Sequence, residues 1–303
     1  MRKKKGGSGD EPPRRFPPPL IECRSKERIE RLFRETMAYS KEERAQWEKL
    51  RKRKGSVLAE YGDFDKHERA FFFSLLYDHF AGTYDQHMGQ DTGHYEAILD
   101  VLTYSSRYLK APILDITAGT GEVLLYALEL ERFGDNFRSH EMGHARRIAG
   151  RLLPDIGRGT IVANEISPKM LGAAREKLEG FDVSFTSYNA LSLPGNWQFQ
   201  TVICSQTMHI LAADDKKGFV QSIHDVLAPG GYAVVIEEDP FLVSRTASID
   251  GVGLFISAVA CPIKQDALIG IFEVNGFEYS EHRAVHPIDS EHVMRVHVFK
   301  KSS

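Results

Sequence analysis

The sequence predicts an α/β protein with a doubly wound, mostly parallel seven-stranded sheet and a helical extension at its N-terminus. From Lys110 onward, short apolar segments alternate with amphipathic helical segments, as in a sheet whose strands are joined by helices. A glycine-rich turn separates the first apolar segment from the helix that follows it. Before Lys110 the apolar residues recur at helical spacing, which predicts helices without strands.

Composition narrows the class of protein. A chain of 303 residues that is 42% hydrophobic suits one large domain with extensions, or two domains, and can bury a sizeable core. No apolar run approaches the length of a membrane span, so we expect none. The three cysteines are widely spaced and form no C-x-x-C pair. This pattern favours a reducing, cytoplasmic location and argues against a thiolate zinc site.

The N-terminal third divides into two parts. Residues 1–20 are rich in Gly, Pro and Arg and are expected to form a disordered basic tail. Residues 21–109 are expected to form a helical extension and lid, with helices within 21–54 and 64–109 and a loop at 81–91. The first 60 residues hold 18 Lys and Arg against 10 Asp and Glu. A solvated tail and a charged helix are the favoured interpretation, and contact with nucleic acid or anionic lipid is the alternative.

Residues 110–303 are expected to form the core of the protein. The predicted strands are residues 111–117, 159–166, 183–190, 199–206 and 232–240, followed by a two-stranded hairpin at 278–301. The predicted helices are residues 121–133, 167–181 with Ser167 as N-cap, 214–231 with a glycine stop, part of 243–260, and 265–277. Residues 133–159 are an additional, helical insert between the first two strands.

The turn LDITAGTGE, residues 114–122, is the first feature that points to a ligand. Gly119 and Gly121 let the backbone pass close to a bound group, and the following helix directs its free N–H groups at the turn. A dinucleotide fingerprint would need a third glycine where the chain has Leu124, and the phosphate-binding loop pattern is absent. Asp115 places a carboxylate beside the turn, which suits a cationic or amino-bearing ligand.

Two further strand ends carry groups that suit a nucleoside. Glu165 ends the second predicted strand, where a carboxylate accepts both ribose hydroxyls. Asn189 ends the third and offers an amide to an adenine edge. Open α/β sheets bind ligands at the carboxyl ends of their strands, so the three groups predict one site.

These motifs, followed by FQTVICSQTMHIL and VLAPGGYAVVIEEDP, resemble in order those of class I S-adenosylmethionine-dependent methyltransferases of the small-molecule type. The resemblance covers roughly Tyr84 to Lys300. It implies a Rossmann-like methyltransferase fold, with the terminal hairpin supplying its reversed seventh strand, and S-adenosylmethionine as cofactor. It assigns twelve positions to that cofactor. They are Tyr84, Asp115, Thr117, Ala118, Gly119, Gly121, Glu165, Ile166, Met170, Asn189, Ala190 and Gln206.

The sequence departs from the family pattern at a few positions. Tyr188-Asn189 replaces the usual Gly-Asp of the third motif, and Thr117-Ala118 stands where Gly-Cys or Gly-Ser is common. The insert at 133–159 also lengthens the gap between the first two motifs. The altered third motif and the insert motivate an alternative, a cofactor-binding regulatory protein without turnover.

The pentapeptide HEMGH, residues 140–144, fits the H-E-x-x-H zinc pattern. The extended pattern requires glycine and histidine where the chain has Arg147 and Gly150. The same stretch is also amphipathic, so we expect a surface helix that caps the cofactor pocket. A zinc hydrolase is therefore disfavoured, and no metal is expected.

Methyl transfer requires an acceptor aligned with the sulfonium methyl group and, for a hydroxyl or carbon acceptor, a base. His209, after the fourth predicted strand, is the candidate base, and a histidine that only packs is the alternative. No N-P-P-Y segment follows that strand, and no Pro-Cys nucleophile is present. A small-molecule acceptor with an O, N or C nucleophile is favoured. RNA or protein, guided by the basic N-terminal arm, is the second choice, and the oligomeric state stays open.

Overall fold

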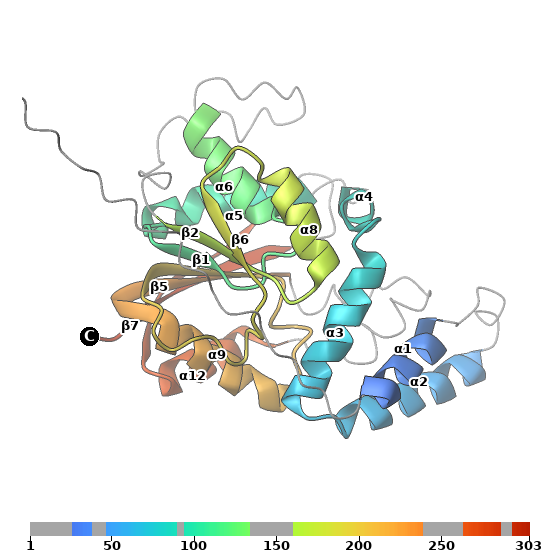
Figure 1. Ribbon diagram of the computed structural model, residues 1–303. Coiled ribbons are helices and arrows are strands. Elements are labelled where there is room, and N and C mark those ends of the chain that lie inside the picture. The colour runs from blue at the N-terminus through green and yellow to red at the C-terminus, as the bar shows by residue number, and fades with distance from the viewer. Residues whose placement is uncertain (1–25, 38–46, 90–93, 134–159, 239–262, 286–292) are drawn as a thin grey trace, which may run out of the picture.

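A computed structural model of the chain describes residues 26–37, 47–89, 94–133, 160–238, 263–285 and 293–303 (Figure 1). Its centre is a seven-stranded sheet with the order β3-β2-β1-β4-β5-β7-β6. The first five strands are parallel, and β7 runs antiparallel to both β5 and β6. The strands are β1 (Ile113–Asp115), β2 (Ile161–Asn164), β3 (Val183–Thr186), β4 (Phe199–Ser205), β5 (Leu227–Glu238), β6 (Phe277–Val285) and β7 (Met294–Lys301). The predicted fold class and the reversed strand are confirmed.

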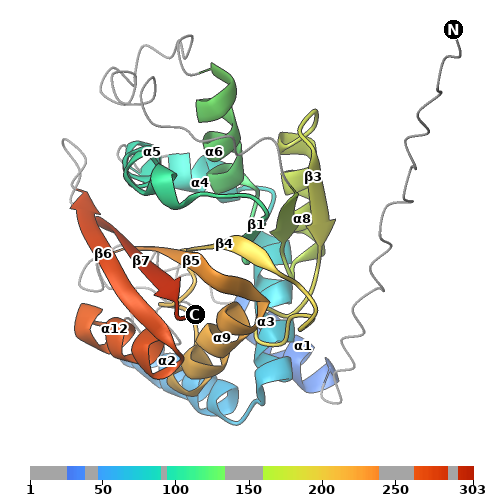
Figure 2. The same ribbon diagram turned by 90° about the vertical axis from the view of Figure 1, so that its left-hand side faces the viewer.

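Helices cover both faces of this sheet (Figures 1 and 2). One face packs against α5 (His94–Ser105), α6 (Glu122–Phe133) and α8 (Pro168–Lys177). The opposite face packs against α9 (Ala213–Val226) and α12 (Gln265–Val274). The sheet is therefore buried on both sides, as a doubly wound sheet must be, and only the strand ends are left for a ligand.

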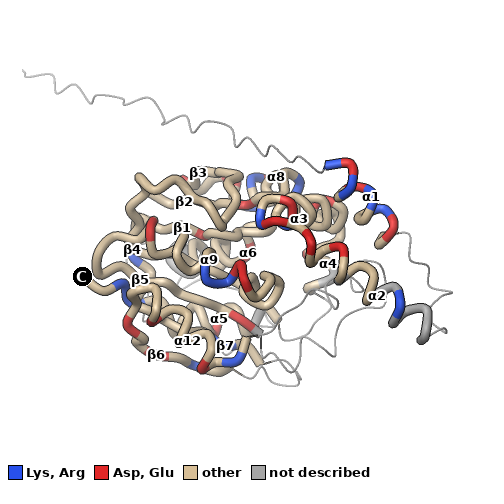
Figure 3. The backbone as a smooth tube through the Cα atoms, turned by 90° about the horizontal axis from the view of Figure 1, so that it is seen from below, with Lys and Arg blue, Asp and Glu red and all other residues tan. Residues whose placement is uncertain are grey.

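The N-terminal helices form a separate layer at the carboxyl ends of the strands. They are α1 (Lys26–Met37), α2 (Trp47–Gly62), α3 (Lys66–Phe80) and the short α4 (Tyr84–Gly89). Ile29, Phe64 and Phe72 belong to the apolar cluster that joins α1, α2 and α3. Outside this cluster α1 mixes charges of both signs along its length (Figure 3), and Arg31 donates to Glu60 at 2.7 Å.

Most sequence predictions of the core elements are confirmed. Each predicted strand overlaps an observed one, and Ser167 caps α8 by accepting a hydrogen bond from the Met170 N–H at 3.2 Å. Predictions for residues 1–20, 243–260 and most of the 133–159 insert, including HEMGH, lie outside the described residues. Among the described helices, none is long and apolar enough to cross a membrane.

Two predicted boundaries were wrong. The expected loop at 81–91 contains α4, because the Tyr84 ring packs on Phe80 with 5.4 Å between centroids and Asp85 accepts from the Thr120 hydroxyl at 2.6 Å. The glycines at the end of the predicted helix 214–231 lie inside β5. A Cβ on Gly231 would lie 3.0 Å from the Gln200 carbonyl oxygen, so this glycine serves the close approach of two strands rather than a helix end.

Candidate functional site

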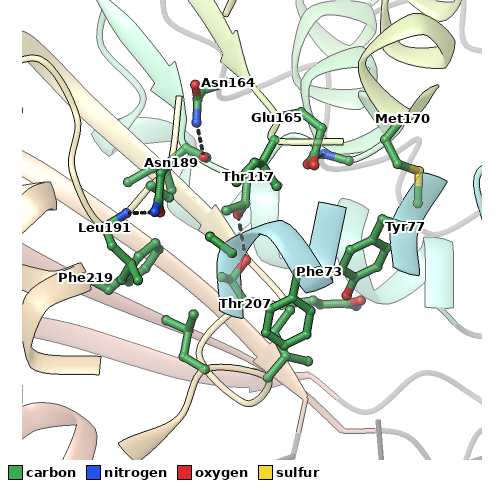
Figure 4. Close-up of a pocket in the computed structure, with 18 of the residues that line it drawn as sticks. Phe73, Tyr77, Thr117, Asn164, Glu165, Met170, Asn189, Leu191, Thr207 and Phe219 are labelled. Carbon is green, nitrogen blue, oxygen red and sulfur yellow. Dashed lines mark hydrogen bonds between the residues drawn. The ribbon is translucent and has the colours of Figure 1, made fainter. Parts of the chain in front are cut away.

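A pocket opens at the carboxyl ends of β1, β2 and β4 and encloses about 880 Å³ of empty space, its open mouth included (Figure 4). The turns after β1, β2, β3 and β4 line one side, and α3 lines the other with Phe73 and Tyr77. Nine of the predicted cofactor positions line it: Tyr84, Thr117, Gly119, Glu165, Ile166, Met170, Asn189, Ala190 and Gln206. Ala118 lines an adjoining compartment, whereas neither lining includes Asp115, Gly121 or the predicted base His209.

The turn after β1 follows the end of β2 closely. The Ala118 N–H donates to the Asn164 carbonyl at 2.9 Å, and the Gly119 N–H donates to Oε2 of Glu165 at 3.0 Å. Gly119 has a φ of 55°, and a Cβ there would meet no atom within 4 Å. The open space beside Gly119 therefore belongs to the pocket, where a ligand can approach the backbone.

Gly121 has a different structural reason to be glycine. Its φ is 82°, and a Cβ would lie 3.1 Å from Cδ1 of Leu178 and 3.2 Å from Cβ of Ala174. These two residues belong to the α8 region that packs against α6. Gly121 thus allows α6 and α8 to pack closely and lies away from the ligand space.

Glu165 is a buried carboxylate held in place by backbone donors. Its Oε1 accepts from the Ser167 N–H at 2.8 Å, and its Oε2 accepts from the Gly119 N–H. Burial raises the pKa of this carboxyl, and these N–H groups oppose the increase. Each oxygen keeps a further lone pair, so the carboxylate is oriented and still able to accept two hydroxyls.

Asp115 is the second buried carboxyl, and its surroundings are different. Its side chain is 1% exposed, and neither oxygen has a hydrogen-bond partner among the described residues. Burial raises its pKa to about 7, although the nearby Thr117 N–H lowers it and the charge of Glu165 raises it further. Above this pKa the carboxyl is ionised, and its negative charge beside the glycine turn would suit a positively charged ligand.

Asn164, at the end of β2, joins three strand ends, and sequence reasoning missed it. Its Nδ2 donates to the carbonyls of Ile116 and Tyr188, both at 3.0 Å, and its Oδ1 accepts from the Tyr188 N–H at 2.8 Å (Figure 4). The only sequence signal was an asparagine inside an apolar strand, where a buried amide needs partners. Asn164 holds the turn after β3 against the turn after β1.

Asn189 presents a hydrogen-bond donor rather than an acceptor. Its Oδ1 accepts from the Leu191 N–H at 2.9 Å, which fixes the orientation of the amide (Figure 4). Among the described residues, its buried Nδ2 has no hydrogen-bond partner. The Gly-Asp of the family motif would place a carboxylate here, so the replacement by Tyr188-Asn189 changes the chemistry of this wall from acceptor to donor.

The residues after β4 form the floor of the pocket. Gln206 has a φ of 51°, which is rare for a residue other than glycine, and its N–H donates to the Ile236 carbonyl at 2.7 Å. The next residue, Thr207, lies 2.6 Å from the Thr117 hydroxyl, oxygen to oxygen (Figure 4). Strained backbone of this kind clusters at functional sites.

His209 lies in the same loop and contacts β5. Its Nδ1 is 2.8 Å from Oε2 of Glu237, and the other carboxylate oxygen accepts from the N–H groups of Thr207 and Met208. Glu237 therefore shapes the loop as well as orienting the imidazole. Because a carboxylate accepts at Nδ1, the proton belongs on that nitrogen and Nε2 is the basic one.

Helix α3 is tied to α8 near one end and to α9 near the other. Near its C-terminal end, Oδ1 of Asp78 accepts from the Ser167 hydroxyl at 2.6 Å and from the Lys169 N–H at 2.9 Å. Near its N-terminal end, the Arg69 guanidinium donates to both oxygens of Asp215 on α9, at 2.6 and 2.7 Å. Spacing along the sequence indicated none of these contacts. They fix α3 across the strand ends as a wall of the pocket.

The described residues contain no group of three or more His, Cys, Asp or Glu side chains arranged to hold a metal ion. Their arrangement fits a sulfonium nucleoside instead. The pocket combines an oriented carboxylate for a ribose with an amide donor for a base, and a buried acid lies behind its lining at the glycine turn.

A family model for a methyltransferase domain matches residues 143–231, a stretch that includes β2, α8, β3, β4 and α9. This match and the seven-stranded fold indicate a class I S-adenosylmethionine-dependent methyltransferase. S-adenosylmethionine is the cofactor that this assignment implies. The matched stretch begins after the glycine turn, so for that turn the assignment rests on the geometry described above. No curated protein matches the chain.

Solved structures share the fold of this methyltransferase. An S-adenosylmethionine-dependent methyltransferase from Clostridium acetobutylicum matches with a TM-score of 0.51 at 12% identity, over 75% of this chain and 99% of that one. Magnesium protoporphyrin IX methyltransferase from Synechocystis, with bound S-adenosylhomocysteine, matches with a TM-score of 0.47 at 15% identity, over 69% and 84%. The CcbJ methyltransferase from Streptomyces caelestis matches with a TM-score of 0.47 at 16% identity, over 69% and 90%.

Proposed function

We propose that this methyltransferase transfers the methyl group of S-adenosylmethionine to a small-molecule acceptor. The observation that carries the proposal is the cover over the strand ends. Arg69, Phe73 and Tyr77 of α3 and Tyr84 of α4 line the pocket opposite the sheet. A pocket with walls on both sides can admit a small acceptor beside the cofactor more readily than a folded macromolecule, so it favours a small acceptor.

The bound cofactor supplies an electrophilic methyl group on a positively charged sulfur. The residues of the chain bind and orient it. Glu165 accepts the ribose hydroxyls, Asn189 donates to the adenine edge, and Ile166 with Met170 packs on the ring. Below the glycine turn, Asp115 provides negative charge near the amino-acid end. In the wall, Tyr77 and Tyr84 lie edge to face, 6.5 Å apart between ring centroids, and offer aromatic surface to a cation.

We further propose His209 as the base for an acceptor that loses a proton. Glu237 holds the imidazole through Nδ1, which makes Nε2 the accepting nitrogen. His209 is not among the residues that line the pocket, so the acceptor would meet it outside that lining. In this proposal His209→Gln lowers kcat by about a hundredfold at unchanged cofactor affinity, a size typical of general-base catalysis.

The test uses S-adenosylmethionine with a labelled methyl group and the full chain. Incubation with metabolites, with RNA and with protein, each separated from the others, should place label in the metabolite fraction. Glu165→Gln should abolish that transfer by weakening cofactor binding. Label confined to RNA or protein would overturn the small-molecule proposal, and so would cofactor binding without transfer to any fraction.

A further inference from the structure

A row of cations and tyrosine rings crosses the surface where α5, the short helix η2 (Ser106–Tyr108) and the edge strand β6 meet (Figure 2). The Arg283 guanidinium carbon lies 5.0 Å from the centre of the Tyr104 ring. The Arg107 guanidinium carbon lies 5.9 Å from that ring and 5.0 Å from the Tyr108 ring. Two further residues extend the row toward β5. The six residues, which we call the cation–tyrosine row, are Arg283, Tyr104, Arg107, Tyr108, Tyr232 and Lys110.

Tyr108 joins the row to β5. Its ring and that of Tyr232 are 5.0 Å apart between centres, and Nζ of Lys110 lies 5.5 Å from the Tyr232 ring. Every ring in the row therefore has a cation within the range of a cation–π contact. The three cations are exposed, and the three rings are partly buried. Among the described residues that line the pocket and its adjoining compartment, none belongs to the row.

One carboxylate lies beside the row and is bound within it. Glu281 accepts from the Arg107 guanidinium at 2.5 Å, and the hydroxyls of the two neighbouring tyrosines also bond to it. Arg283 and Lys110, at the two ends of the row, have no ion-pair partner among the residues that the structure describes. Three cations and one carboxylate therefore leave a positive surface, and its free charge lies at the ends.

A single-stranded nucleic acid carries both kinds of group that such a row can bind. Its phosphates pair with exposed cations, and its bases stack on aromatic rings or on guanidinium planes. Insertion into a membrane fits less well, because it needs exposed apolar side chains. In the described part of the chain, the one strongly exposed large apolar side chain is Val274, on α12 at the opposite face of the sheet. An acidic protein segment would use the charges and leave the rings unused.

We propose that the cation–tyrosine row binds single-stranded nucleic acid without sequence preference. Lys110 and Arg283 bind phosphates at the two ends, and the Arg107 guanidinium with the rings beside it stacks bases between them. Because the row lies outside the pocket lining, bound nucleic acid leaves the pocket open to a small acceptor. The inference depends neither on the cofactor assignment nor on the acceptor.

Fluorescence anisotropy with the full chain and a labelled oligouridylate of about ten nucleotides tests the proposal. Lys110→Gln combined with Arg283→Gln removes two phosphate contacts. The slope of log affinity against log salt should become shallower by about 1.4, and binding at low salt should weaken about tenfold. Tyr108→Leu should weaken binding roughly fivefold to a hundredfold and leave the slope unchanged, because stacking releases no counterions. Urea unfolding of each variant checks that it is folded.

The matched control is Arg175→Gln combined with Lys217→Gln, which makes the same change in net charge. Arg175 also lies over an aromatic ring, 4.7 Å from the centre of Phe185, but both cations are on helices outside the row. The control should bind within about twofold of wild type. A wild-type chain that ignores the oligonucleotide at low salt would overturn the proposal, and so would equal weakening by the two double variants. Equally tight binding to phosphatidylserine vesicles or to polyglutamate would also overturn it, because the surface would then recognise negative charge alone.

Discussion

Asp115→Asn should make the stability of the ligand-free protein less dependent on pH. The Asp115 carboxyl is 1% exposed, and burial raises its pKa from 3.8 to about 7. Between these values the folded protein keeps a proton that the unfolded chain has lost. Stability therefore falls as pH rises through this window. Integration from pH 5 to pH 8 gives a loss on the order of 3 kcal/mol in the free energy of unfolding from this carboxyl alone.

Urea unfolding of the wild type and of Asp115→Asn at pH 5 and pH 8 measures this contribution. The asparagine does not titrate, so the variant should lose less unfolding free energy than the wild type between the two pH values, by an amount on the order of 3 kcal/mol. Other titrating groups affect both proteins equally and cancel in the difference. Parallel pH profiles would refute the reasoning, because they would mean that the buried carboxyl has an ordinary pKa.

Four other substitutions separate the roles of site residues. Gly119→Ala and Gly121→Ala should each strain a left-handed backbone by about 1–2 kcal/mol. Gly119→Ala should mainly reduce the affinity for S-adenosylhomocysteine, because its Cβ would meet no protein atom. Gly121→Ala should mainly lower the urea midpoint, because its Cβ would meet side chains at α8. Asn189→Asp turns a donor into an acceptor, so the preference for adenosyl- over inosylhomocysteine in calorimetry should increase about tenfold. Asp78→Ala should weaken S-adenosylhomocysteine binding about fivefold and destabilise the fold by about 1 kcal/mol. If the variant and the wild type bind S-adenosylhomocysteine with the same affinity, α3 does not orient Glu165.

The sequence predicted the parts of the fold and site that are encoded locally. The glycine turn, the acid at the end of the second strand and the cap at Ser167 each depend on a few neighbouring residues, and the structure has them where they were expected. The strand order near β1 follows from the same local alternation of strands and helices. Gly121 shows the limit of such reasoning. The sequence indicated that a Cβ would collide at this position, but it did not indicate that the collision would be with the α8 region.

Contacts between distant segments could not be predicted from spacing. Arg69 and Asp215 are 146 positions apart, and nothing near either residue indicates that they form a bidentate ion pair. The α4 helix and the start of β5 were missed for a similar reason, because tertiary contacts decide them against local preference. His94 likewise reaches the compartment beside the pocket through the packing of α5.

The N-terminal helices line the pocket, and α3 helps to position its buried carboxylate, Glu165. Asp78 on α3 accepts a hydrogen bond from the Ser167 hydroxyl at 2.6 Å. The Ser167 N–H in turn donates to Glu165 at 2.8 Å. A shift of α3 would therefore move the cap of α8 together with Glu165, the carboxylate that we propose accepts the ribose hydroxyls. Since α3 is also anchored to α9 by a buried ion pair between Arg69 and Asp215, disturbance of the helical extension should change cofactor affinity before it unfolds the sheet.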